Sequence, residues 1–116
     1  MERLSIDLDA RSYPILVGPG LLGSPTLLDE AVRARDVLVV TNETVGPLYL
    51  ERLRAGLAGR RVESVVLPDG ERHKTLDTLA RVFDALVEHR MNRDACIAAL
   101  GGGVVGDMAG FAAACY

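Results

Sequence analysis

Aromatic residues are scarce in this sequence: there is no tryptophan, and all aromatics together make up 4% of its 116 residues. Few rings are therefore available to stack on nucleic-acid bases, and a net charge of −3 offers no positive surface to a phosphate backbone. No apolar run reaches the roughly 18 residues that a membrane helix needs. The acidic, alternating N-terminus does not resemble a signal peptide. We therefore expect a cytoplasmic protein without nucleic-acid or membrane partners.

Cysteine and lysine are also rare. Cys96 and Cys115 lie 19 positions apart, without CxxC spacing and without a nearby histidine. A metal site or a redox pair is the alternative reading, but this spacing favours two small buried apolar residues. The sequence has twelve arginines and a single lysine, Lys74, which is therefore a candidate for a specific role.

The length of 116 residues allows one small domain, and the sequence contains no internal repeat. Such a length is short for a complete enzyme. The chain ends at Tyr116, in or just after a predicted helix, with no capping signal. We expect the sequence to be part of a longer protein.

The first third of the chain shows two patterns. Residues 4–8 alternate between apolar and polar side chains, which predicts a half-buried strand, and residues 13–17 form a second apolar stretch. Together they indicate a β-hairpin. Ser24 followed by Pro25 is typical of a helix start, and the apolar face of this helix continues toward Arg35.

The remainder alternates between strands and helices. Apolar runs predict buried strands at 36–41 and 95–100, and a further strand is predicted at 62–67. Helical spacing predicts helices over 45–57, with Gly59 at the C-terminal cap, over 75–91, ended by Asn92, and after residue 103. The expected stripe of the second of these helices is Leu76, Leu79, Phe83, Leu86 and Val87. Alternation of this kind predicts an α/β fold with a Rossmann-like parallel sheet behind the N-terminal hairpin.

A glycine-rich loop follows the last predicted strand. Gly101, Gly103 and Gly106 fit G-x-G-x-x-G between a strand and a helix, where glycines let a pyrophosphate approach the backbone and the helix N-terminus. The loop follows the last visible strand rather than the first, so a purely structural turn stays open as an alternative. Asp107, at the expected helix start, either stabilises that terminus or holds a ligand group. The absence of G-K-[ST] excludes a P-loop.

A second polar cluster, PDGERHK at 68–74, follows the strand over 62–67. Its composition also fits a solvated turn. Since loops after parallel strands meet at one edge of the sheet, Glu71 there could bind a ribose diol and Lys74 a phosphate. Asn42 is expected either to contact the same ligand or, with Thr44, to cap the next helix. The two histidines, His73 and His89, are interpreted as exposed polar residues without a partner.

Three segments together resemble a known family. VVTN at 39–42, PDGExxK at 68–74 and ALGGGVVGDMAGFAAA at 99–114 are similar, in this order and spacing, to the dehydroquinate synthase group of sugar-phosphate cyclases. The resemblance covers the whole chain but about the first third of the family's usual length. It implies an NAD-dependent, phosphate-eliminating lyase of the shikimate pathway, which converts 3-deoxy-D-arabino-heptulosonate 7-phosphate to 3-dehydroquinate. In that family NAD transiently oxidises a ring hydroxyl, and zinc or cobalt polarises that hydroxyl.

The resemblance also implies how the site is divided. Residues 1–116 would form an N-terminal NAD-binding domain, without catalytic or metal-ligating residues of their own. A C-terminal helical domain would supply the metal ligands, one Glu and two His, and most substrate contacts. The chain alone would be inactive, and the full-length protein would be a homodimer. The implied cofactor-binding residues are Asn42, Asp69, Gly70, Glu71, Arg72, His73, Lys74, Gly102, Gly103, Val104, Val105, Gly106 and Asp107.

Two other readings stay open. Another sugar-phosphate cyclase, such as a 2-deoxy-scyllo-inosose synthase, would differ in substrate residues downstream of this sequence. A non-catalytic nucleotide-binding module would keep the loops and lack the chemistry.

Overall fold

The computed structural model describes all residues from Met1 to Tyr116. Two antiparallel strands, β1 (Glu2–Ile6) and β2 (Tyr13–Val17), come first and form a hairpin. A short helix α1 (Pro25–Ala31) then leads into the parallel part of the fold. That part consists of β3 (Asp36–Asn42), α2 (Gly46–Gly56), β4 (Arg61–Leu67), α3 (Leu76–Glu88), β5 (Cys96–Leu100) and α4 (Gly103–Cys115). No helix is long and apolar enough to span a bilayer.

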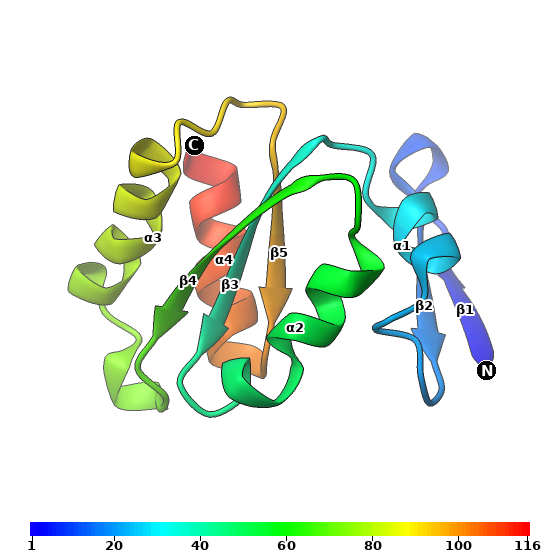
Figure 1. The fold of residues 1–116 in the computed structure, drawn as a ribbon, viewed down its shortest axis with the longest axis horizontal. Helices are drawn as coiled ribbons and strands as arrows, with labels where there is room; N and C mark the ends of the chain where they lie inside the picture. Colours follow the sequence, from blue (N-terminus) through cyan, green and yellow to red (C-terminus); the bar gives the residue numbers. More distant parts are fainter.

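The three later strands form one parallel sheet in the order β4–β3–β5. Their arrowheads point the same way in Figure 1. Strand β3 is central, and from Val37 to Asn42 every one of its residues is buried. The prediction of an α/β fold with a parallel sheet and an N-terminal hairpin is therefore confirmed.

Alternate residues of β3 build two cores, one on each face of the sheet. Val37 and Val39 pack with Leu53 and Leu57 of the α2 segment. Leu38 and Val40 pack on the other face, in a core whose further members come mainly from α3 and α4. The two-residue period of the strand thus assigns α2 to one face and α3 and α4 to the other.

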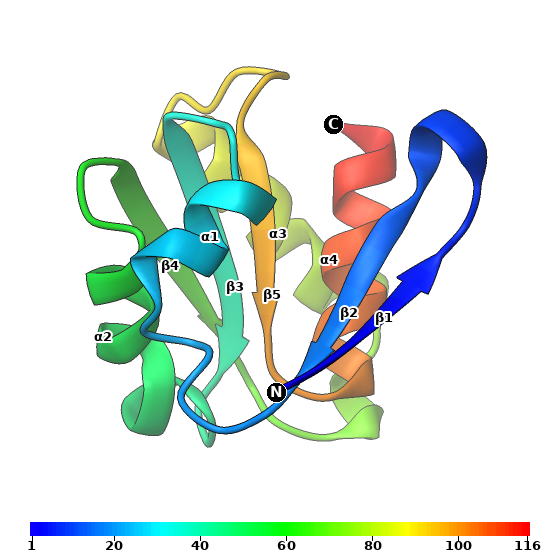
Figure 2. The same cartoon turned by 90° about the vertical axis from the view of Figure 1, so that its right-hand side faces the viewer.

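The N-terminal hairpin stands beside this sheet rather than in it (Figure 2). The prediction that its first strand is half-buried and reaches Leu8 is wrong. Strand β1 ends at Ile6, because the Leu8 amide turns to donate to Ser12 Oγ at 2.8 Å. Leu4 is 55% exposed, since no other part of the structure covers this face of the hairpin.

Helix α1 begins as predicted, with the Ser24 hydroxyl accepting from the Leu27 amide at 3.4 Å and Pro25 at the first helical position. It ends earlier than predicted, at Ala31, because Val32 adopts an extended conformation that directs the chain into the core. Arg35 therefore lies outside the helix.

The expected faces of α2 and α3 need correction. Leu48, Leu76 and Val87 are 64%, 80% and 66% exposed, although their spacing predicted burial. Leu79 and Leu86 of the expected stripe are buried as predicted. The other buried residues of α3 are Thr78, Val82 and Ala85, because the helix is turned to set Val82 and Ala85 against the sheet.

The ends of these two helices also differ from the prediction. Helix α3 ends at Glu88, with His89 as its cap, and not at Asn92. Helix α2 ends at Gly56 and Leu57 is its cap. Gly59, with a φ of +89°, belongs to the turn that follows.

Strand β5 is at the edge of the sheet, and this corrects its predicted full burial. Its residues are half-buried and Ala99 is exposed, because only β3 pairs with it. Cys96 is likewise half-buried and Cys115 is exposed, so the prediction of two buried cysteines is wrong. Both thiols are free.

Candidate functional site

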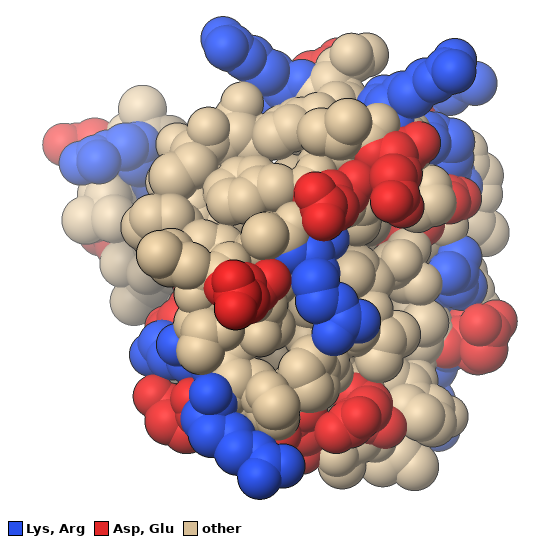
Figure 3. Space-filling view, turned by 90° about the vertical axis from the view of Figure 1, so that its left-hand side faces the viewer, with Lys and Arg blue, Asp and Glu red and all other residues tan.

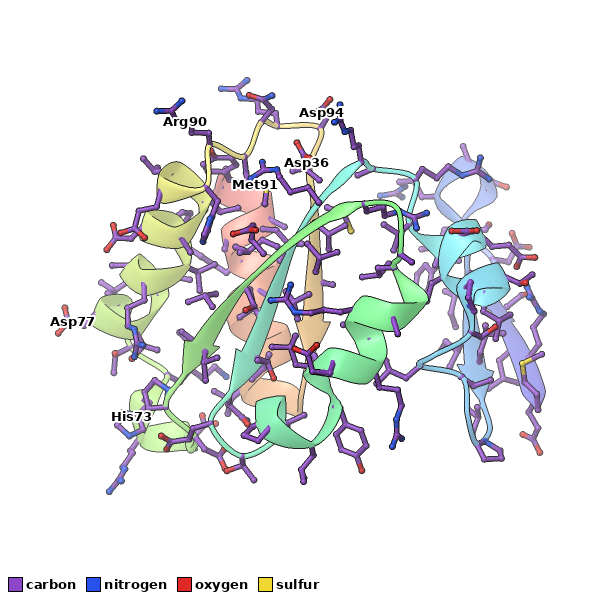
Figure 4. The ribbon with its side chains drawn as sticks, in the orientation of Figure 1. Asp36, His73, Asp77, Arg90, Met91 and Asp94 are labelled. Atoms are coloured by element: carbon purple, nitrogen blue, oxygen red, sulfur yellow. The ribbon has the colours of Figure 1, made fainter.

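The register of the sheet brings three loops to one edge. Asn42, the last residue of β3, lies opposite Leu67 at the end of β4, and Thr41 lies opposite Leu100 at the end of β5. The turn after Asn42, the loop 68–74 and the glycine loop therefore start side by side, as predicted. Figure 4 shows His73 at this carboxyl end of the strands and Asp36 and Met91 at the opposite end.

The crevice of the sheet lies between β3 and β5. These strands are neighbours, yet the helices that follow them lie on opposite faces, α2 on one and α4 on the other. Loops after such a strand pair diverge and leave room between them, which is where open α/β sheets bind ligands. The glycine loop is therefore at a topological switch point even though it follows the last strand of the chain.

Most of the glycines in this loop are not required by the fold. None of Gly101–Gly103 or Gly106 has a positive φ. A Cβ at Gly102, Gly103 or Gly106 would meet no other heavy atom within 4 Å, whereas one at Gly101 would lie 3.0 Å from the Val105 side chain. Gly101 is explained by packing, and the other three leave an open backbone surface.

The first turn of α4 has unused hydrogen-bond donors. No side chain caps this helix, and its first backbone bond runs from the Gly106 amide to the Gly102 carbonyl. The amides of Gly103, Val104 and Val105 are thus available to a ligand. The Val105 side chain is buried in the core, so only its backbone can serve the site.

Lys74 joins the two principal loops. Its Nζ lies 2.8 Å from Asp107 Oδ2 and 3.8 Å from Glu71 Oε1. The hydrogen bond and charge of Asp107, followed by the charge of Glu71, raise the pKa of Lys74 above its ordinary value of 10.5. Asp107 lies in the second turn of α4 rather than at its start, so its contact is with Lys74 and not with the helix terminus.

This ion pair borders a cavity of about 370 Å³ between the start of α3 and α4. The other lining residues are Thr75, Leu76, Leu79, Met108 and Phe111. Phe111 is 55% exposed at this cavity. The cavity therefore has one charged wall at the carboxyl edge and apolar remaining walls.

The prediction that Asn42 caps the next helix is wrong, because the N-cap of α2 is Val45 and no side chain caps it; Asn42 instead closes the turn before the helix. Its Oδ1 accepts from the amides of Thr44 and Val45 at 3.0 and 2.7 Å, and its Nδ2 donates to Asp69 Oδ1 at 3.3 Å. The Thr44 hydroxyl donates to the other oxygen of Asp69 at 2.8 Å. The sequence predicted Thr44 only as part of a helix cap. Its hydrogen bond to Asp69 depends on the register of β3 and β4, which the sequence does not reveal.

The histidines are not without partners, which corrects that expectation. His89 Nδ1 lies 2.8 Å from Glu63 Oε2, because the end of α3 packs beside β4. His73 accepts from Arg72 Nε at 3.2 Å. His89 is far from the carboxyl edge and does not join the candidate site, whereas His73 and Arg72 belong to the loop 68–74.

Charge on the surface over α3 is mixed. Figure 3 shows lysine and arginine interspersed with aspartate and glutamate and separated by uncharged surface. No group of three or more His, Cys, Asp or Glu side chains is placed to hold a metal ion. The site in these residues consists of backbone donors, one lysine and several carboxylates.

Known proteins are similar to this chain in sequence. The family model for the 3-dehydroquinate synthase N-terminal region matches residues 64–116. The chain is 60% identical, over its full length, to the 3-dehydroquinate synthase of Methylococcus capsulatus and 56% identical to that of Pseudomonas fluorescens. It spans 32% of the length of each of these relatives.

Solved structures agree in fold. A 2-deoxy-scyllo-inosose synthase in complex with carbaglucose-6-phosphate, NAD+ and Co2+ superimposes with a TM-score of 0.84 at 21% identity, covering 99% of this chain and 32% of that one. The 2-epi-5-epi-valiolone synthase of Streptomyces hygroscopicus, with NAD+ and Zn2+ bound, gives 0.70 at 37% identity, covering 94% and 31%. Over its whole length the chain is thus similar to about a third of the 3-dehydroquinate synthase of Methylococcus capsulatus, and its residues 64–116 match the N-terminal region of that family.

Proposed function

We propose that residues 1–116 are the NAD-binding part of a 3-dehydroquinate synthase. The full-length enzyme converts 3-deoxy-D-arabino-heptulosonate 7-phosphate to 3-dehydroquinate and phosphate, and it acts as a homodimer. The observation that carries the proposal is the open glycine surface at the β3–β5 switch point, in a chain 60% identical to a synthase of that name.

The residues present fit a dinucleotide. A pyrophosphate can approach the backbone at Gly102, Gly103 and Gly106, where a Cβ would otherwise point into open space, and can accept from the free amides of Gly103–Val105. Glu71, exposed on the loop 68–74, offers a carboxylate for a ribose diol. NAD bound here would supply transient oxidation of a substrate hydroxyl.

The residues present do not fit the zinc or cobalt ion, since no group of three potential ligands exists among them. We therefore place the metal ligands, and most substrate contacts, in the part of the relatives that this chain does not span. The isolated 116 residues would then lack the metal site and turn over no substrate.

Calorimetric titration of NAD into the full-length protein, with a phosphate-release assay on 3-deoxy-D-arabino-heptulosonate 7-phosphate, tests the proposal. Saturable binding and phosphate release are expected. Binding without release from this substrate, but with turnover of glucose 6-phosphate, would favour the 2-deoxy-scyllo-inosose synthase alternative. Only the fold likeness at 21% identity supports that alternative. Absence of NAD binding would contradict the proposal.

Lys74→Met should weaken NAD binding about tenfold, because a positive charge that faces the nucleotide phosphates is lost. The pKa of Lys74 is raised above its ordinary value of 10.5, so the side chain stays charged at neutral pH and loses its charge only as the pH rises through the raised value. The ratio of wild-type to variant affinity should therefore be constant between about pH 6 and 9. A ratio that falls across this range, measured by calorimetry, would show that another group is responsible.

A further inference from the structure

The loop 68–74 carries the side chains assigned to the nucleotide, and the His73 and Lys74 amides close its short turn by donating to the Gly70 and Glu71 carbonyls, both at 3.0 Å. Gly70 has a φ of +118° and a ψ of 150°, a conformation that residues with a Cβ rarely adopt. The chain bends there, directly before the 3-10 turn of Glu71–His73. The loop is consequently held at both ends, by whatever fixes Asp69 before the bend and by the ion pair of Lys74 with Asp107 after it.

Asp69 is fixed from the neighbouring strand. Its Oδ2 accepts from Thr44 Oγ1 at 2.8 Å, its Oδ1 accepts from Asn42 Nδ2 at 3.3 Å, and its amide donates to Glu43 Oε1 at 3.2 Å. The last residue of β3 and the two residues after it thus hold one residue after β4. The shortest of these bonds is the one from Thr44, and it is charge-assisted because the acceptor is a carboxylate.

From these contacts we infer that Thr44 is a positioning residue for the nucleotide. Its hydroxyl holds the Asp69 carboxylate, which orients Gly70 and presents Glu71 and Lys74 to the ligand. Thr44 is itself exposed, so its side chain contributes little to the core. The inference rests on the proposed function, because the loop 68–74 is taken to bind NAD.

Thr44→Val in the full-length protein removes the donor and keeps the shape of the side chain. NAD should bind about tenfold more weakly by calorimetry, the scale of one charge-assisted hydrogen bond. Thr44→Ser restores the hydroxyl and should restore the affinity. Thr26, an exposed threonine of α1, supplies the matched control, and Thr26→Val should leave the affinity unchanged.

Asp69→Asn tests whether Thr44 acts through Asp69 or touches NAD directly, because the variant leaves one acceptor oxygen for the Thr44 and Asn42 donors.

If Thr44 acts through Asp69, the double variant Thr44→Val/Asp69→Asn should bind NAD as tightly as whichever single variant has the lower affinity. Additive losses would mean that Thr44 touches the nucleotide itself, which would overturn the inference. Unchanged affinity in Thr44→Val, or no recovery in Thr44→Ser, would also overturn it and leave the proposed function intact. Absence of NAD binding by the wild-type protein would overturn the proposed function instead.

Discussion

Gly103→Val should reduce the affinity of the full-length protein for NAD by about 100-fold or more, which corresponds to about 2.7 kcal/mol or more. The added side chain would project into the open space at the start of α4, where the pyrophosphate must approach the backbone. Nothing in the chain itself lies within 4 Å of a Cβ at this position, so folding should be unaffected. Calorimetry measures the affinity and thermal unfolding checks the fold.

Gly110 provides the control for this variant. It lies in the same helix, also has no heavy atom within 4 Å of a Cβ, and is two turns further from the helix start. Gly110→Val should bind NAD like the wild-type protein. Equal affinity of the Gly103→Val and wild-type proteins would mean that the glycine loop is only a structural turn.

Gly56→Ala should destabilise the full-length protein by about 1–3 kcal/mol, although alanine favours helices. A Cβ there would lie 2.4 Å from Leu28 Cδ1 and 2.8 Å from the Leu22 carbonyl oxygen. The leucine side chain can move, but the backbone oxygen cannot do so without shifting the segment before α1. Denaturant unfolding gives the free energy of unfolding directly.

Gly110→Ala should have the opposite effect and increase the free energy of unfolding. This exposed helical position gains the propensity of alanine, about 1 kcal/mol, with no clash in the chain. A stabilised Gly56→Ala protein would contradict the close packing of α1 against α2. Equal changes in the free energy of unfolding at Gly56 and Gly110 would show that helix propensity alone determines the effect of the substitution.

The parallel part of the fold was predictable because its signals are local and strong. The run 36–41 has four consecutive apolar residues and lies in the central strand β3, which is buried from Val37 to Asn42. The edge position of β5 was not predictable, since an apolar run of the same kind, 95–100, says nothing about which strands flank it. The true stripe of α3 depends on the rotation that packing imposes: Leu76 and Val87 fit the period and are exposed.

The candidate site was predictable at the level of loops. Parallel strands require the three loops to share one edge, and the register confirms this for Asn42 and the two loops beside it. The link from Thr44 to Asp69 needed the structure, because it joins residues 25 positions apart across two strands. The partner of His89, Glu63, needed the structure for the same reason, whereas the partner of His73 is the adjacent residue, Arg72.

Hydrogen–deuterium exchange of the full-length protein with and without NAD tests the central claim most directly, because it reports on the backbone amides assigned to the pyrophosphate. NAD should slow exchange in peptides that cover residues 68–75 and 101–107, and it should leave the hairpin over residues 2–17 unchanged. Exchange at 101–107 that is unaffected by saturating NAD would contradict the assignment of the glycine loop as the dinucleotide site.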